Sequence, residues 1–307
     1  MPEQFKAAKN MVISTDKVTA SIFKNSNIFA NSQGLNVKTS RKNNMVVTVD
    51  LPPGAEKVGW ETPLTLFDRE VLDTINTLIE AGNKAITTDQ IYRHMIGQPH
   101  CKRKAVKNTA AAIEATMNSL RSKVIRIDAT QEAKTYGFTP GHDGQVTIEG
   151  SILSFRKITI TAGGNQVTGF VIDSSLLYQN YSKAKKQVAS ILPITCNAVP
   201  GIKHTTANTE LIGYLKRRIL AMRPTQRQSK RPLSKKINIA NMLEDLGVAY
   251  KADKASDAVR AAKSRTLKAT YKILDYWQSV ICEDGKPFIK SYSIIGKKPV
   301  KNIEISF

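Results

Sequence analysis

Cysteine and histidine are scarce in this sequence, and none of them is spaced to hold a metal. The chain has 307 residues but only three cysteines, Cys101, Cys196 and Cys282, and no two of them form a CxxC pair. This spacing argues against a disulfide framework and against a zinc knuckle. The four histidines form no HxH or HExxH pair, so the metal site of a strand-nicking enzyme finds no support. We expect ordinary thiols in a reducing cytoplasm, with no metal and no cofactor.

Long apolar runs and catalytic signatures are missing as well. No run approaches the roughly 18 apolar residues of a membrane span, and residues 1–17 lack the apolar segment of a secretory signal. No GxSxG occurs. Residues 164–170, GNQVTGF, have the glycine spacing of a phosphate loop, but Phe170 stands where that loop needs lysine. The sequence therefore predicts a cytoplasmic protein that contacts no membrane and is not an enzyme.

Acidic residues are few relative to basic ones. The 46 Lys and Arg residues outnumber the 25 Asp and Glu residues, which gives a net charge of +21 and a pI near 9.9. Residues 203–307 contain 22 basic and 9 acidic residues (22 − 9 = +13), whereas residues 61–150 contain 11 of each (11 − 11 = 0). A field of this sign attracts polyanions, above all nucleic acid. We expect the last third of the chain to contribute most of the affinity.

The hydrophobic periodicity predicts the same series of elements twice. A helix from residue 62 to about 81, a short helix at 89–95 and an amphipathic helix at 102–123 precede several short strands separated by glycine turns. Helices at 206–222, 239–248 and 256–281 then precede strands within 283–295 and 300–307. This is the order of a helix-turn-helix with an added β wing. Repetition of one supersecondary unit indicates tandem domains.

We therefore predict an α+β fold with two tandem winged-helix domains. The predicted boundaries are an N-terminal arm at 1–60, partly irregular apart from a strand near 45–54, a first domain at 61–175, a connecting segment at 176–205 and a second domain at 206–307.

The helix predicted at 256–281, which begins SDAVRAAKSRTLKATYKILDYW, divides into two parts. Its basic side chains all precede residue 273, and its large apolar side chains follow residue 265. A recognition helix has this layout, because its first turns enter the major groove while the rest anchors it in the domain. Trp277 lies on the apolar arc, so we expect it in the core. A solvated helix face is the alternative interpretation.

Neighbouring basic segments favour nucleic acid over a merely solvated face. The segment RPTQRQSKRPLSKK at 223–236 contains no acidic residue, and the helix predicted at 102–123 also has a basic entry. Most such groups neutralise phosphates, and only a few read bases. Arg260 and Arg265 could pair with guanine, and Asn108 with adenine. The predicted DNA-binding residues are Lys102, Arg103, Lys104, Lys107, Asn108, Arg227, Lys230, Arg231, Arg260, Lys263, Ser264, Arg265, Lys268, Lys286 and Lys290.

Three segments carry a resemblance to a known family. Residues 62–97, 126–138 and 207–219 resemble replication initiators of plasmids and mobile elements from Gram-positive bacteria. The resemblance implies a non-enzymatic protein that binds double-stranded origin DNA, recruits the host helicase and polymerase, and in some members represses its own gene as a homodimer. It implies that the helices at 102–123 and 256–281 are the recognition elements. The alternatives are a winged-helix transcription regulator or partition factor, and a DNA-acting enzyme or RNA-binding protein.

Overall fold

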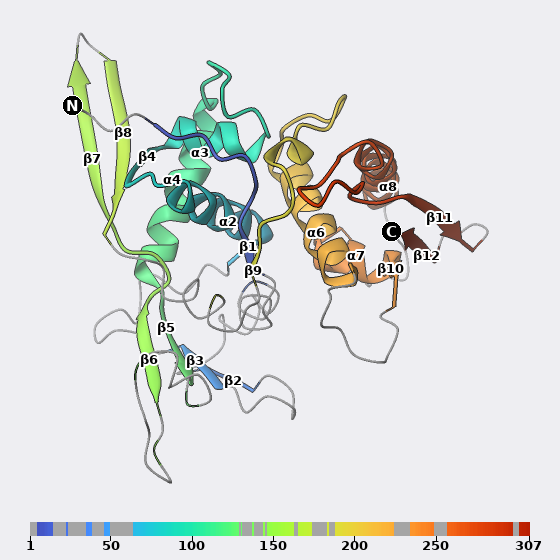
Figure 1. The fold of residues 1–307 in the computed structure, drawn as a ribbon, viewed down its shortest axis with the longest axis horizontal. Helices are drawn as coiled ribbons and strands as arrows, with labels where there is room; N and C mark the ends of the chain where they lie inside the picture. Colours follow the sequence, from blue (N-terminus) through green and yellow to red (C-terminus); the bar gives the residue numbers. More distant parts are fainter. Residues whose placement is uncertain are drawn as a thin grey trace. The chain divides into compact units, whose positions relative to one another are not determined.

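The chain divides into two compact units in a computed structural model (Figure 1). Residues 1–8, 12–94 and 99–188 form the first unit, and residues 9–11, 95–98 and 189–307 form the second. Helices and small antiparallel sheets alternate along the chain, so the predicted α+β class is confirmed. The structure describes residues 5–14, 23, 35–38, 46–49, 64–128, 130, 137, 144, 146–162, 165–173, 183, 188–223, 234–248, 257–296 and 301–307.

Three helices and a three-stranded sheet form the framework of the first unit. The elements are α2 (Leu66–Glu80), β4 (Ala85–Thr87), α3 (Thr88–Met95), α4 (Lys107–Ser122), β7 (Phe155–Ala162) and β8 (Asn165–Ile172). The sheet order is β4-β8-β7. The long β7–β8 hairpin runs from the pair Phe155↔Ile172 to the pair Ala162↔Asn165 (Figure 1). The strand between the first two helices therefore pairs with the last strand of the unit.

A second sheet in this unit joins distant parts of the chain. It contains β2 (Leu35–Lys38), β3 (Val46–Val49), β5 (Val124–Asp128) and β6 (Thr147–Ser151), in the order β2-β3-β5-β6. The short strands β1 (Ile13–Ser14) and β9 (Val188–Ala189) complete the described strands before residue 190. The strand expected near 45–54 is thus present and pairs with β5, through Val47↔Ile127 and Thr48↔Arg126.

The second unit repeats the helix and strand order of the first, apart from strands β1–β3, β5 and β6, which have no counterpart among its described residues. Its elements are the 3-10 helix η3 (Ile194–Asn197), α6 (Thr206–Met222), β10 (Lys236–Asn238), α7 (Ile239–Asp245), α8 (Asp257–Trp277), β11 (Ser291–Ile295) and β12 (Asn302–Ser306). The sheet order is β10-β12-β11. Here too the strand between the first two helices pairs with the last strand, which pairs with the strand before it.

Side-chain oxygens fix where several of the helices begin. Thr65 and Asp68 form a capping box at α2, with Asp68 N donating to Thr65 Oγ1 and Thr65 N donating to Asp68 Oδ2. Thr205 caps α6, and Asn238 caps α7. At the other end of α2, Gly82 has φ +91°, the left-handed conformation that glycine adopts without strain.

Helix α2 is buried on its polar side as well as its apolar side. Residues 5–8 and 12–14 cover that polar side. Arg69 Nη2 donates to Ser14 O at 3.0 Å, Val12 N donates to Thr77 Oγ1 at 2.9 Å, and Lys6 N donates to Asn83 Oδ1 at 2.9 Å. An amphipathic helix predicts one buried face, so this second covering layer is an addition that periodicity does not reveal. It makes α2 the centre of the unit's core.

The buried imidazole of His94 gives this packing a pH dependence. Its side chain lies in the first unit, where its Nε2 accepts a hydrogen bond from Ala8 N at 3.4 Å and its Nδ1 lies 2.8 Å from Gln90 O. Burial is the main cause that lowers the pKa of His94, with smaller lowering by Arg93 and His100, while the Gln90 carbonyl raises it. The folded state therefore prefers the neutral ring, with the proton on Nδ1.

We expect the free energy of unfolding to fall as the pH is lowered through the ordinary histidine pKa near 6.5. Below that pH the unfolded chain takes up a proton that the folded chain resists, so stability is lost toward the lowered folded pKa. Urea denaturation at pH 7.5 and at pH 5 measures the difference. In His94→Gln the difference should shrink most, whereas His100→Gln, which removes only one of the minor causes, should retain most of it. An unchanged pH dependence in His94→Gln contradicts the assignment.

Candidate nucleic-acid interface

The first cluster of predicted DNA-binding residues lies at the start of α4. Lys102, Arg103, Lys104, Lys107 and Asn108 are all exposed. None of these four cationic groups forms an ion pair with another residue in the part of the chain that the structure describes. The structure thus brings all five residues together over one loop and one helical turn.

Contacts from α3 hold the loop that carries this cluster. Arg93 Nη1 donates to Cys101 O at 2.9 Å, and Ala105 N donates to Asp89 Oδ1 at 2.9 Å. These bonds keep residues 101–106 out of the helix, which therefore begins at Lys107 and not at Lys102 as predicted. Lys102, Arg103 and Lys104 consequently precede α4 instead of lying on it.

The other side of α4 fixes the helix against the core and the hairpin. Ile113, Met117 and Leu120 are fully buried. On the outer part of the helix, Glu114 Oε2 forms an ion pair with Lys157 Nζ on β7, at 2.9 Å. The Arg121 guanidinium lies 5.0 Å from the centroid of the Phe155 ring. Both contacts join the base of the β7–β8 hairpin to α4. The helix that follows the basic cluster is therefore fixed to the hairpin.

Helix α8 carries the second cluster and has the divided layout predicted from its sequence. Arg260, Ser264, Arg265 and Lys268 are exposed, and Lys263 is half-buried. Thr270, Ile273, Leu274 and Trp277, in contrast, are fully buried. The basic side chains of this cluster therefore lie within residues 260–268, and the fully buried side chains that anchor the helix follow from residue 270.

Trp277 is a core residue, as the sequence predicted. Its indole is 0% exposed, and Nε1 donates to the Cys196 carbonyl oxygen at 2.9 Å. The Phe288 ring packs edge-on against it, with ring centroids 5.1 Å apart. A tryptophan held in this way cannot stack on a base, so its contribution to the interface is to anchor α8.

Arg260 is already engaged within α8. Its Nη2 lies 2.6 Å from Asp257 Oδ1, one helical turn earlier. Both side chains are largely exposed, so the pair contributes little to stability, but it neutralises part of the charge of Arg260. Arg265, which forms no ion pair with another described residue, presents its full charge.

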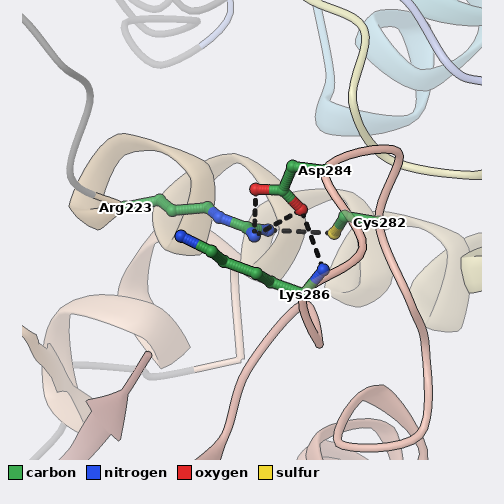
Figure 2. A network of polar contacts seen from close by, with 4 residues as sticks. All are labelled: Arg223, Cys282, Asp284 and Lys286. Atoms are coloured by element: carbon green, nitrogen blue, oxygen red, sulfur yellow. Dashed lines mark hydrogen bonds and ion pairs between the residues drawn. The ribbon is translucent and has the colours of Figure 1, made fainter.

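The turn after α8 carries Lys286 and is held by a polar network (Figure 2). Arg223, at the end of α6, donates to Cys282 Sγ at 2.9 Å and to both Asp284 carboxylate oxygens at 3.0 and 3.2 Å. Lys286 N donates to Asp284 Oδ1 at 3.2 Å. Burial raises the pKa of the Cys282 thiol, and the Arg223 guanidinium partly offsets this.

Arg223 is the first residue of the basic segment at 223–236, but this network holds its side chain at the turn after α8. Its guanidinium is occupied by the turn, while the side chains of Lys286 and Lys290 are exposed. Sequence reasoning missed this positioning role, because Arg223 and Asp284 are 61 residues apart and no periodicity joins them. Of the predicted site residues, Arg227, Lys230 and Arg231 lie outside the described residues.

The residues that the structure describes contain no group of three or more His, Cys, Asp or Glu side chains that could hold a metal ion. Nor does any helix there have the length and apolar character needed to cross a membrane. The two exposed basic clusters, one in each unit, are therefore the candidate site.

Comparison with known proteins gives a structural similarity but no sequence match. The sequence matches no family model and is similar to no curated protein. Among solved structures, the chain is similar to the crystal structure of domains 2 and 3 of RctB, with 12% identity and a TM-score of 0.47, over 95% of this chain and 96% of that one. The resemblance of residues 62–97, 126–138 and 207–219 to initiators of Gram-positive bacteria stays a prediction from those short segments.

Proposed function

We propose that the protein is a replication initiator that binds double-stranded origin DNA through two winged helices. One observation carries this proposal. In both units exposed basic residues precede or occupy the first turns of the third helix, and its later turns are buried, on the same helix, strand and hairpin framework. A net charge of +21 supports a polyanionic partner.

The repeated framework supports reading α4 and α8 as recognition helices. In helix-turn-helix proteins the N-terminal residues of the second helix of the motif contact base edges in the major groove. α3–α4 and α7–α8 are the corresponding helix pairs, and the β7–β8 and β11–β12 hairpins are the wings. Most of the lysines at these places bind phosphates, which positions the protein without reading sequence.

Arg265 and Asn108 are the best candidates for reading bases. Arginine reads guanine and asparagine reads adenine through two parallel hydrogen bonds. Both side chains are exposed, Asn108 in the first turn of α4 and Arg265 in the third turn of α8. Arg260 has to give up its contact with Asp257 before it can do the same, so we assign it a smaller share.

We expect Arg265→Ala to weaken binding to the specific duplex by about 1–3 kcal/mol, and binding to random DNA by much less. Arg260→Ala should have a smaller effect, because Asp257 already occupies its guanidinium. The matched control is Lys272→Ala, because Lys272 is exposed but lies in the stretch of α8 whose buried side chains begin at Thr270. It should change binding by under about 1 kcal/mol. Titration of labelled duplexes at two salt concentrations measures all three. If Arg265→Ala binds like the parent on every duplex, the helix is a solvated face.

The wider role follows from the family resemblance. We propose that the bound protein acts in the cytoplasm on a plasmid or other mobile element, recruits host helicase or replisome proteins, and can do so as a homodimer. The proposal assigns no catalysis to the chain. A supercoiled plasmid incubated with the protein and magnesium should therefore stay supercoiled.

The decisive experiment joins the gene to its adjacent DNA on a plasmid that cannot otherwise replicate. Persistence of that plasmid supports initiation, and loss of persistence when the basic cluster at α8 is removed ties it to DNA binding. Should the plasmid be lost while the protein still binds promoter DNA, the chain is a transcription regulator or partition factor instead.

A further inference from the structure

An exposed valine stands in the middle of the first basic cluster. The described residues expose four large hydrophobic side chains, and Val106 is the most exposed of them, at 64%, ahead of Ile281 at 56%, Ile294 at 48% and Ile158 at 44%. Lys104, Lys107 and Asn108, all exposed, surround it in sequence. An apolar side chain in this place contributes nothing to the core.

Val106 also occupies the N-cap of α4, where valine is unfavourable. Its backbone is extended, with φ −67° and ψ 152°, and no side chain caps the helix. Ser, Thr, Asp and Asn are preferred at this position because their oxygens accept from the first amides. At α2, α6 and α7 the chain uses Thr65, Thr205 and Asn238 in this way. Exposure and the missing cap are thus two independent disadvantages at one residue.

The loop geometry fixes the direction from which Val106 is presented. Ala105 N is bonded to Asp89 Oδ1 on α3, and the Val106 carbonyl accepts the bond from Ala110 N at 2.9 Å. The residue before the valine is therefore anchored to α3, and the carbonyl of the valine itself is anchored to the first turn of α4. When the N-terminal end of α4 docks onto a partner, Val106 therefore approaches the same surface as the lysines of the first basic cluster.

We propose that Val106 reads thymine, by packing against the C5-methyl group of one thymine in the major groove. This inference rests on the proposed function and names one base that α4 recognises. Among the edges that bases show in the major groove, the thymine methyl is the apolar one. The neighbouring lysines bind the phosphates, while the isopropyl group of Val106 packs against the thymine methyl group. This contact explains why an apolar residue occupies the N-cap position of α4, where a side chain with a capping oxygen is usual.

The test replaces thymine by uracil, which removes only that methyl group. The preferred duplex is first selected from random sequences with the full chain, and each thymine in it is then exchanged singly. The wild-type protein should lose about fourfold in affinity at one position, the effect of exposing one methyl-sized apolar group. In Val106→Ala the ratio between the thymine and uracil duplexes should be close to one at that position.

Two further variants separate recognition from stability. Val106→Ser supplies a capping oxygen, so its thermal midpoint should rise while thymine discrimination is lost. Val106→Thr also caps the helix but keeps one methyl group, so it should retain part of the discrimination. Ile281→Ala, which removes an exposed aliphatic group in the other unit, should keep the full fourfold ratio.

The outcomes distinguish this inference from the proposed function. If the chain selects a duplex but Val106→Ala discriminates thymine from uracil as well as the wild type does, the inference alone is wrong. A wild-type protein that discriminates at no thymine would contradict the inference in the same way. If the chain binds no duplex at all, the proposed function falls and takes the inference with it.

Discussion

Trp277→Ala is expected to lower the free energy of unfolding by about 3–5 kcal/mol, the range for removing a large buried aromatic side chain. The indole is 0% exposed and packs edge-on against Phe288, so its removal leaves a cavity that the surrounding elements cannot fill. The Cys196 carbonyl, which accepts from Nε1 at 2.9 Å, also loses its partner. Urea denaturation followed by circular dichroism measures the loss.

Trp277→Phe is the matched control for this prediction. It keeps an aromatic ring in the core but removes the N–H donor, so its loss should approach the contribution of one hydrogen bond, about 0.5–1.5 kcal/mol. The difference between the two variants then reports the packing contribution. A Trp277→Ala protein that is as stable as the parent but binds DNA poorly would overturn the core assignment, because it would make the indole part of the interface.

Removing the basic groups of either cluster should make DNA binding less sensitive to salt. Each phosphate contact adds about −0.9 to the slope of log K against log salt concentration, because binding releases counterions. A full-length variant with Arg260, Lys263, Arg265 and Lys268 replaced by alanine should therefore flatten the slope by up to about 3.6. The same treatment of Lys102, Arg103, Lys104 and Lys107 should flatten it less, because residues 203–307 carry the larger charge excess.

A control for these variants is an exposed lysine outside both clusters, such as Lys203, whose replacement by alanine should leave the slope nearly unchanged. The two cluster variants and the control are compared on one duplex over the same series of salt concentrations. Equal flattening by both cluster variants would contradict the asymmetry between the units. Flattening by neither would show that the clusters do not face the phosphates.

Periodic features of the sequence predicted much of the framework, because they depend on residues three or four apart. Helix α8 is an example: it was predicted at 256–281 and spans Asp257–Trp277, with Trp277 buried. It ends earlier than predicted because the chain turns back, with Ile281 forming a bridge to Pro287. Apolar periodicity continues past the helix and does not register such a turn.

Features that depend on distant partners were not predictable in the same way. The delayed start of α4 depends on the bond between Asp89 and Ala105, and the burial of α2 depends on residues 5–8 and 12–14. The position of the Arg223 side chain likewise depends on its bonds to Asp284. Charge and composition drew attention to Lys102, Arg103 and Lys104, but could not distinguish a loop from a helix there. The exposure of Val106 was not predictable either, since it depends on where the helix begins.

The division of the chain between its units has a consequence for its biosynthesis. Residues 9–11 belong to the second unit, where Lys9 O accepts from Ile194 N and Met11 N donates to Leu192 O, each at 2.9 Å. A growing chain exposes this segment before nearly all of the first unit, but its partners are made much later. The first unit must therefore fold while leaving residues 9–11 accessible to residues 192–194, which are made later. A recombination event that replaces the coding sequence after residue 188 would accordingly transfer an incomplete second unit, because residues 9–11 would stay with the other gene.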